Sequence, residues 1–270
     1  MAQQNKVVRI EGSVMKVNSY VVESAAGVLI VDGMLTVSDA RTVRRHIDAL
    51  GRPVLGAVVT HAHPDHYAGF HEMLRGIETK VYATAQVRKA IEQDDPIKDA
   101  IVGQMMGAEW PELRVFPQSD VAAGSALSLA DGALVLGVRD VGPAESPADS
   151  LWMLDERAYF VGDLVYNGMH AYLADGYHHE WLQVLDRLQG ELDPDATLFV
   201  GHGEPGPARV LLGAQRRYVE TFVESVSRHR QLEPDARRRA VMQDMQRALP
   251  SEDLTFLTEL SVDPVAAALV

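Results

Sequence analysis

Residues 58–66 of the chain read VVTHAHPDH, and this stretch carries the strongest information about fold and chemistry. The apolar, β-branched run over 54–60 predicts a buried strand, and a helix is expected from about residue 66 to residue 74. His61 and His63 stand two residues apart at the end of the strand. An extended backbone therefore points both rings to the same side. Asp65 and His66 follow in the turn that opens the helix.

This loop has the composition of a metal site. A lone histidine in a loop is usually an ordinary polar residue, but three histidines and an aspartate within 61–66 form a ligand set. Two imidazoles can bind one metal ion, and the carboxylate and third imidazole can bind a second ion a few Å away. Two ions about 3.5–4 Å apart can share a bridging water and hold both the attacking and the developing oxygen.

The rest of the chain alternates short strands and helices in two halves. We expect no linker between them, because no stretch is rich in Ser, Gly or Pro. A helix over 38–50 has Ser38 as its candidate N-cap, and an apolar stripe that includes Val210 and Phe222 is expected to pack on the core. Further strands are expected over 7–10, 17–23, 28–31, 80–83, 126–165 and 198–200, and further helices over 84–110, 180–189 and from 207 onward.

The segment Thr60–Gly69, THAHPDHYAG, resembles the signature of the metallo-β-lactamase superfamily. Three further matches occur in the family's order: Asp32-Gly33 after an early strand, Gly162-Asp163 in a middle strand, and Gly201-His202-Gly203 after a late strand. The resemblance implies a four-layer αββα sandwich with the site at the shared edge of two sheets. We expect residues 1–270 to form a single domain, with 207–270 as a helical C-terminal extension packed on it.

One position departs from the family pattern. The family's commonest ligand set has a histidine in a stretch like GPGHTxxD, whereas Gly142–Asp149 here read GPAESPAD and place Glu145 at that position. Either the site has lost a ligand and is degenerate, or Glu145 is itself the ligand. We favour the second interpretation, because a carboxylate oxygen binds zinc at nearly the distance of an imidazole nitrogen. The run also resembles, locally, the EAPAE run of the alkylsulfatase branch, in which a glutamate binds the metal.

The resemblance then implies the roles of the site residues. Asp163 would bridge the two ions, and Asp65 would also act as acid or base. His170 and Tyr172 are candidates to donate a hydrogen bond to the substrate, Asp32 is expected to be structural, and His178 and His179 to be exposed or capping. Core packing is favoured for Met105, Met106 and Trp110, with a pocket wall as the alternative. Metal one is assigned to His61, His63 and Glu145, and metal two to Asp65, His66 and His202.

The implied function is a dinuclear metal-dependent hydrolase that uses a metal-bridging hydroxide on a small ester, thioester or lactone. Zinc is the expected metal, with Mn or Fe as alternatives because Glu145 is a harder ligand. Three other functions stay open: a sulfate-ester hydrolase, a mononuclear iron dioxygenase, and a degenerate non-catalytic binding protein. The intact Asp65, His66 and His202 weigh against the last two, because both leave the second ligand set without a purpose.

The amino-acid composition argues against some classes of binding partner and metal ligand. Lys and Arg number 25 against 38 Asp and Glu, giving a formal net charge of −13, which argues against nucleic acid and anionic membranes as partners. There is no cysteine, so any metal must be held by histidine and carboxylate ligands. The N-terminus lacks the pattern of a secretory signal. We expect a cytoplasmic protein that acts on a small-molecule substrate. A homodimer is the candidate oligomeric state.

Overall fold

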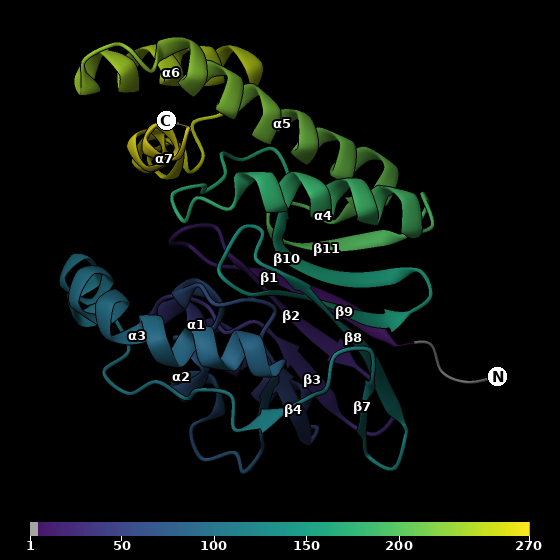
Figure 1. Cartoon of the computed structure of the whole chain (residues 1–270). Coiled ribbons are helices and arrows are strands. Elements are labelled where there is room, and N and C mark those ends of the chain that lie inside the picture. Colours follow the sequence, from purple (N-terminus) through teal and green to yellow (C-terminus); the bar gives the residue numbers. More distant parts are fainter. Residues whose placement is uncertain (1–4, 270) are drawn as a thin grey trace.

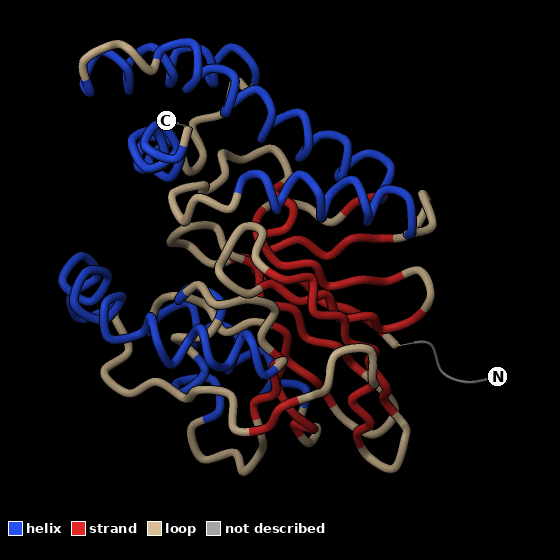
Figure 2. Tube along the Cα trace, in the orientation of Figure 1, coloured by secondary structure: helices blue, strands red, loops and turns tan. Residues whose placement is uncertain are grey.

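The computed structural model describes residues 5–269; the outermost residues of the predicted domain, 1–4 and 270, lie outside this range. Two six-stranded sheets pack face to face between layers of helices (Figures 1 and 2). The predicted αββα sandwich with additional C-terminal helices is therefore confirmed.

The first sheet has the order β1-β2-β3-β4-β5-β6. Strands β1 to β3 pair antiparallel, whereas β3 to β6 pair parallel, so their carboxyl ends meet at one edge. Buried aliphatic residues fill β3, as expected for a strand covered on both faces. The bounds are β1 Lys6–Glu11, β2 Asn18–Glu23, β3 Val28–Val31, β4 Val54–Val58, β5 Val81–Ala83 and β6 Ser119–Asp120.

The second sheet has the order β12-β11-β10-β9-β8-β7. It is antiparallel except for the parallel pair of β10 and β11. Turns at Asp131-Gly132 and at 155–157 join β7 to β8 and β9 to β10. The bounds are β7 Ala126–Leu129, β8 Leu134–Gly142, β9 Asp149–Asp155, β10 Ala158–Tyr166, β11 Thr197–His202 and β12 Gly206–Pro207.

Three apolar clusters correspond to the three interfaces between layers. One lies between the sheets, where Trp152 and Phe160 meet Tyr20 and Leu29. Another joins the first sheet to its covering helices, and the third joins the second sheet to α4 and the C-terminal helices. The helices are α1 Val37–Leu50, α2 Phe70–Leu74, α3 Ala85–Met106, α4 His178–Glu191, α5 Ala208–His229, α6 Pro234–Ala248 and α7 Thr255–Ala268; short 3₁₀ turns are η1 Pro64–His66 and η2 Gly107–Glu109.

Some predicted local features were wrong. The N-cap of α1 is Thr36, whose hydroxyl accepts from the Asp39 N–H, and Ser38 lies inside the helix. Strand β4 ends at Val58, since the next residues leave the sheet toward the candidate site. The helix expected from residue 66 is a 3₁₀ turn followed by the short α2. Val210 is 53% exposed, so it does not belong to the buried stripe of α5.

The C-terminal helices share the core of the second sheet. Phe222 of α5, Val241 and Met245 of α6 and Val262 of α7 are buried in the same cluster as the strands β10 and β11. Figure 1 shows α5 lying over α4, with α6 and α7 beyond one end of the sandwich. None of the helices described within residues 5–269 combines the length and apolar character needed to cross a membrane.

The two sheets are linked at one edge. Isolated bridges join Val17, just before β2, to His202 at the end of β11, and His61, just after β4, to Asp149 at the start of β9. Gly201 is needed at this point, because a Cβ on it would collide with the carboxylate of Asp163. The close approach brings side chains from both sheets into one cluster.

Candidate metal centre

Seven predicted ligands gather at this edge, and all of them are buried. His61 and His63 lie in the loop after β4, and Asp65 lies in η1. Glu145 comes from the loop between β8 and β9, which the Asp149 bridge ties down. The two groups of potential ligands are His61, His63 and Glu145, and Asp65, His66, Asp163 and His202, with ligand atoms within 4.8 Å of one another in each group.

Asp163 lies between the two groups. Its Oδ2 is 3.8 Å from His61 Nε2 of the first group and 3.2 Å from His202 Nε2 of the second. Its Oδ1 is 3.3 Å from His66 Nε2. A carboxylate in this position can contact two ions at once, as the sequence-based assignment of Asp163 requires.

Five of these side chains point an unsatisfied polar atom into the centre. Leaving a buried polar atom without a partner costs about 1–3 kcal/mol, and ion pairs within the cluster, such as His202 Nε2 with Asp163 Oδ2 at 3.2 Å, offset only part of this cost. Bound cations would remove this cost. The atoms, which make no hydrogen bond within the described structure, are His61 Nε2, His66 Nε2, Glu145 Oε2, Asp163 Oδ1 and His202 Nε2.

In each of the four histidines, the ring nitrogen that faces away from the cluster contacts a hydrogen-bond partner. His66 Nδ1 donates to Asp32 Oδ2 at 2.8 Å, and His202 Nδ1 donates to the Met15 carbonyl at 2.9 Å. His63 Nε2 donates to Asp175 Oδ2 at 2.9 Å. His61 Nδ1 lies 3.1 Å from Thr60 Oγ1, which itself donates to Asp32. These bonds fix each ring so that its free nitrogen faces the cluster, an arrangement that is typical of metal-binding histidines.

Asp32 therefore supports the site, as expected from the sequence. It accepts from the Thr60 N–H and hydroxyl as well as from His66. Its backbone has a φ of +64°, a left-handed conformation that costs energy for a residue other than glycine. Such strain persists where the surrounding structure fixes it, and here three hydrogen bonds do so.

Without metal, the charges of the cluster compensate one another by shifted pKa values. Burial disfavours the charged ring of His202, but the carboxylates of Asp163 and Asp65 outweigh it and raise the pKa to about 10. Burial and the neighbouring His66 cation lower the pKa of His61. Burial raises the pKa of Glu145 to about 7, against the effect of His63. Metal ions and protons thus compete for the same atoms.

Glu145 lies beside the two histidines of the first ligand group. Its side chain is 1% exposed, with Oε2 2.8 Å from His63 Nδ1 and 3.6 Å from His61 Nε2. These are the free nitrogens of the first group. A buried carboxylate in this position fits a metal ligand better than it fits a degenerate site.

Tyr166 is a site residue that the sequence analysis did not single out. Its hydroxyl lies 2.7 Å from Asp163 Oδ2 and 2.9 Å from Glu145 Oε1, and its ring stacks on His202 with centroids 4.9 Å apart. Burial and the two carboxylates raise its pKa well above the usual value, so the hydroxyl keeps its proton. The only signal in the sequence is its place three residues after Asp163.

The two candidate hydrogen-bond donors have different environments. Tyr172 lines the cavity over the cluster, but its hydroxyl donates to Asp175, the residue that holds His63. His170 does not line this cavity. Its ring nitrogens lie 3.0 Å from the Tyr218 hydroxyl and 3.1 Å from the Ser251 carbonyl, so it joins α5 to the segment before α7. The placement of His170 argues against direct contact with a substrate.

Of the remaining sequence-based assignments, some agree with the structure and others do not. His179 is exposed, as expected, whereas His178 is buried in the first turn of α4. Met105 and Met106 line the cavity, so the pocket-wall alternative describes them better than core packing. Trp110 is buried, and its indole N–H donates to Asp99.

The comparisons with known proteins place this architecture in a family. The family model of the metallo-beta-lactamase superfamily matches residues 12–202. The chain therefore belongs to the metallo-β-lactamase superfamily, whose members are generally hydrolases. No curated protein sequence matches it.

Solved structures agree at the level of the fold. A beta-lactamase domain protein from Burkholderia ambifaria aligns with 100% of this chain and 87% of its own, with a TM-score of 0.71 and 17% identity. A metallo-beta-lactamase from Pontibacter korlensis aligns with 80% of this chain and 99% of its own, with a TM-score of 0.60 and 18% identity. The mono-zinc form of the metallo-beta-lactamase FIM-1 from Pseudomonas aeruginosa covers 79% and 89%, with a TM-score of 0.57 and 20% identity.

Proposed function

We propose that this protein is a dinuclear metal-dependent hydrolase that acts on a small ester, thioester or lactone. The observation that carries the proposal is the gathering of five buried polar atoms, from both sheets and without hydrogen bonds within the described structure, in two adjoining ligand groups. We assign His61, His63 and Glu145 to the first ion, Asp65, His66 and His202 to the second, and Asp163 to both. Zinc suits this set of nitrogen and oxygen donors, and its three carboxylates, those of Asp65, Glu145 and Asp163, also suit Mn or Fe.

Bound ions would supply an activated water at neutral pH and polarise the substrate carbonyl. The protein supplies the proton transfers and the orientation. Asp65, which lines the cavity, takes a proton from the attacking water and returns it to the leaving alcohol or thiol as the C–O or C–S bond breaks. The Tyr166 hydroxyl, at the cavity floor between the two ligand groups, would turn its single proton from Asp163 and Glu145 to the oxygen that gains negative charge.

The charge around the cavity favours a neutral substrate. Among the described residues that line it, Lys98 is the one Lys or Arg, while Asp65, Glu145 and Asp163 are acidic. The net charge of −13 adds to this bias. Two divalent ions would be balanced by Asp65, Glu145, Asp163 and a hydroxide, which leaves Lys98 as the one further cation. Phosphodiesters and sulfate esters usually need several cationic contacts, so they rank below carboxylic esters and lactones.

The test is a hydrolysis panel with a paired metal experiment. Metal-loaded protein is assayed on a 4-nitrophenyl ester, a thioester, a γ-lactone, a sulfate ester and a phosphodiester, before and after chelation and metal return. We expect hydrolysis of the first three substrates, lost on chelation and restored by metal. Asp65→Asn should lower kcat by at least about 10²-fold, while the exposed control Asp131→Asn leaves it unchanged. Absence of hydrolysis by fully loaded protein would overturn the proposal.

A further inference from the structure

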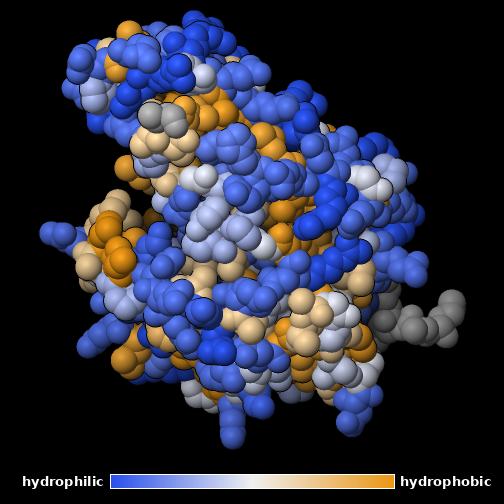
Figure 3. All heavy atoms as spheres, in the orientation of Figure 1, coloured by the Kyte–Doolittle hydropathy of each residue, from blue (hydrophilic) through white to orange (hydrophobic). Residues whose placement is uncertain are grey.

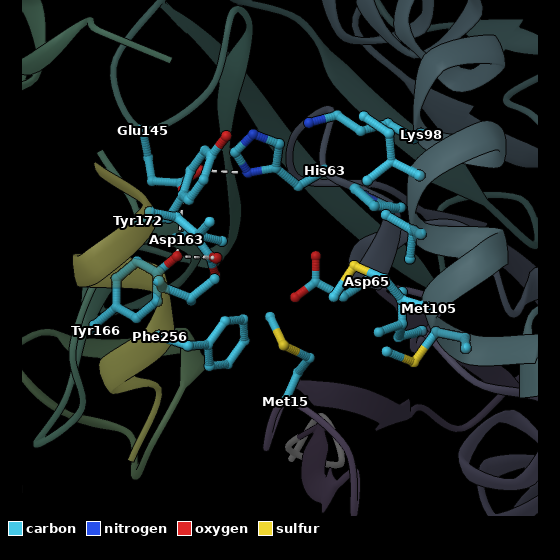
Figure 4. Close-up of a pocket in the computed structure, with 17 residues that line it drawn as sticks. Met15, His63, Asp65, Lys98, Met105, Glu145, Asp163, Tyr166, Tyr172 and Phe256 are labelled. Carbon is cyan, nitrogen blue, oxygen red and sulfur yellow. Dashed lines mark hydrogen bonds and ion pairs between the residues drawn. The ribbon is translucent and has the colours of Figure 1, made fainter. Parts of the chain in front are cut away.

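A cavity of about 270 Å³ opens directly onto the candidate metal centre. Its floor contains His63, Asp65, Glu145 and Asp163, and its sides are almost entirely apolar. Figure 4 shows Phe256 pointing in from α7 and Met105 standing across from it on α3, with Asp65 between them. The reacting centre is therefore reached through an apolar passage.

The walls of this cavity are more apolar than exposed surface usually is. Within residues 5–269, nine large apolar side chains are strongly exposed, and four of them line this one cavity. Clustered exposed apolar residues indicate binding, whereas single ones need no explanation. The four are Ile101 and Met105 of α3, with 55% and 64% exposure, and Phe256 and Leu260 of α7, with 42% and 57%. Figure 3 shows apolar side chains beside the hollow between these helices.

The α7 wall is held in a fixed place relative to the centre. Ser261 Oγ accepts from the Leu173 N–H at 2.8 Å, and Thr258 Oγ1 lies 2.7 Å from the Tyr218 hydroxyl. His170 binds the Ser251 carbonyl just before the helix. Helix α7 also lies beyond residues 12–202, which match the family model. The wall is thus built against the site by a segment outside the residues that match the family model.

We propose that this cavity is a chain-binding cleft: the substrate carries an aliphatic chain that lies between α3 and α7, and Phe256 and Leu260 set the preferred chain length. The inference rests on the proposed hydrolase function and adds the substrate class to it. Met15, Met105 and Met106 lie along the cleft, and their unbranched, polarisable side chains adapt to chains of different shape. The cleft ends at the ligand cluster, so an occupant must present its polar group there.

A small molecule fits this cleft better than a second protein. The volume of about 270 Å³ is close to the lower end for ligand pockets, and one apolar chain with a polar head can fill it. Lys98, which forms no ion pair among the described residues, lies at the side of the cavity with its Nζ 6.0 Å from the Tyr172 ring centroid. A polar group near the reacting bond could contact it.

The test measures hydrolysis against chain length. The acyl side is varied in 4-nitrophenyl acetate, butyrate, hexanoate and octanoate, and the alcohol side in ethyl, butyl and octyl acetates. We expect kcat/KM to rise about two- to fourfold per methylene in at least one series, because each buried methylene contributes favourable transfer free energy. Leu260→Ala and Phe256→Ala should each lower kcat/KM for the longest chain about tenfold and change acetate less than twofold. Val210→Ala, an exposed apolar residue away from the cavity, is the matched control.

A binding measurement separates failure of this inference from failure of the hydrolase proposal. Calorimetry with butanoate, hexanoate, octanoate and decanoate on metal-loaded protein should give a Kd that falls with chain length, and this fall should be weaker in Leu260→Ala. If esters are cleaved at rates independent of chain length and the Kd values are equal, the hydrolase stands and the cleft proposal is wrong. If no ester is cleaved but the Kd still falls with chain length, the hydrolase proposal fails and the cleft stands.

Discussion

Replacing Tyr166 with phenylalanine tests how the site stabilises charge. The substitution removes one hydroxyl and keeps the ring that stacks on His202 at 4.9 Å. That hydroxyl lies 2.7 Å from Asp163 and 2.9 Å from Glu145, so it stands between the two ligand groups at the cavity floor. No other described tyrosine hydroxyl contacts both groups. The variant therefore isolates one donor.

The expected magnitude follows from the role assigned to the hydroxyl. Loss of one donor to a developing oxyanion lowers kcat by about 10²–10³-fold, or roughly 2.7–4 kcal/mol. If Tyr166 only orients the ligands, the loss would instead fall on metal affinity, by about 10–100-fold. The two outcomes separate when kcat is measured at saturating metal. We expect a fall of at least about 10²-fold in kcat with unchanged metal content.

The assay is the hydrolysis of 4-nitrophenyl butyrate, with metal content determined on the same sample. Tyr159→Phe is a matched control, because Tyr159 lies on the same strand, β10, and its hydroxyl donates to the Glu156 carbonyl away from the site. It should leave kcat unchanged. A Tyr166→Phe protein with both metal sites filled and kcat within threefold of the wild type would refute the reasoning.

Three other predictions follow from the same geometry. Glu145→Gln should weaken the first metal site about 10²–10³-fold, the share of one ligand in a typical structural zinc affinity, as measured by competition with a chelating dye; unchanged affinity would remove Glu145 from the ligand set. Gly201→Ala should displace Asp163 and lower both metal content and melting temperature, whereas Gly190→Ala, where no atom lies within 4 Å of the added Cβ, should change neither. Because the folded pKa of His202 is raised from 6.5 to about 10, its stabilising charge is present below pH 6.5 and lost toward pH 10. The melting temperature of metal-free protein should therefore fall over this range and that of metal-loaded protein should fall less; parallel curves would contradict this.

Much of the site could be predicted because its ligands are grouped in the chain. The HxHxDH loop has the spacing of a strand end followed by a turn, and local geometry alone brings its side chains together. Asp163 and His202 follow strands in the order that the family resemblance implies. The role of Glu145 depended on how the replacement of one histidine in the family pattern was interpreted. Its side chain is buried, with Oε2 2.8 Å from His63 Nδ1, which fits the ligand interpretation.

The parts that could not be predicted depend on contacts between distant segments. Asp175 supports His63 across 112 positions, and nothing near Asp175 in the sequence indicates this role. The cleft between α3 and α7 exists only because helices far apart in the chain face the same cavity. His170 follows Asp163 closely, yet tertiary packing turns it toward Tyr218 and Ser251. For these residues, unlike those of the HxHxDH loop, proximity in sequence was a poor guide to proximity in the site.

The central claim is that two ions share this centre, and metal stoichiometry tests it most directly. Protein purified without added metal is analysed by elemental mass spectrometry, beside Glu145→Ala. The account predicts about two divalent ions per chain in the wild type and a value near one in the variant. Negligible metal in the wild type, a single iron, or two ions retained by Glu145→Ala would contradict it.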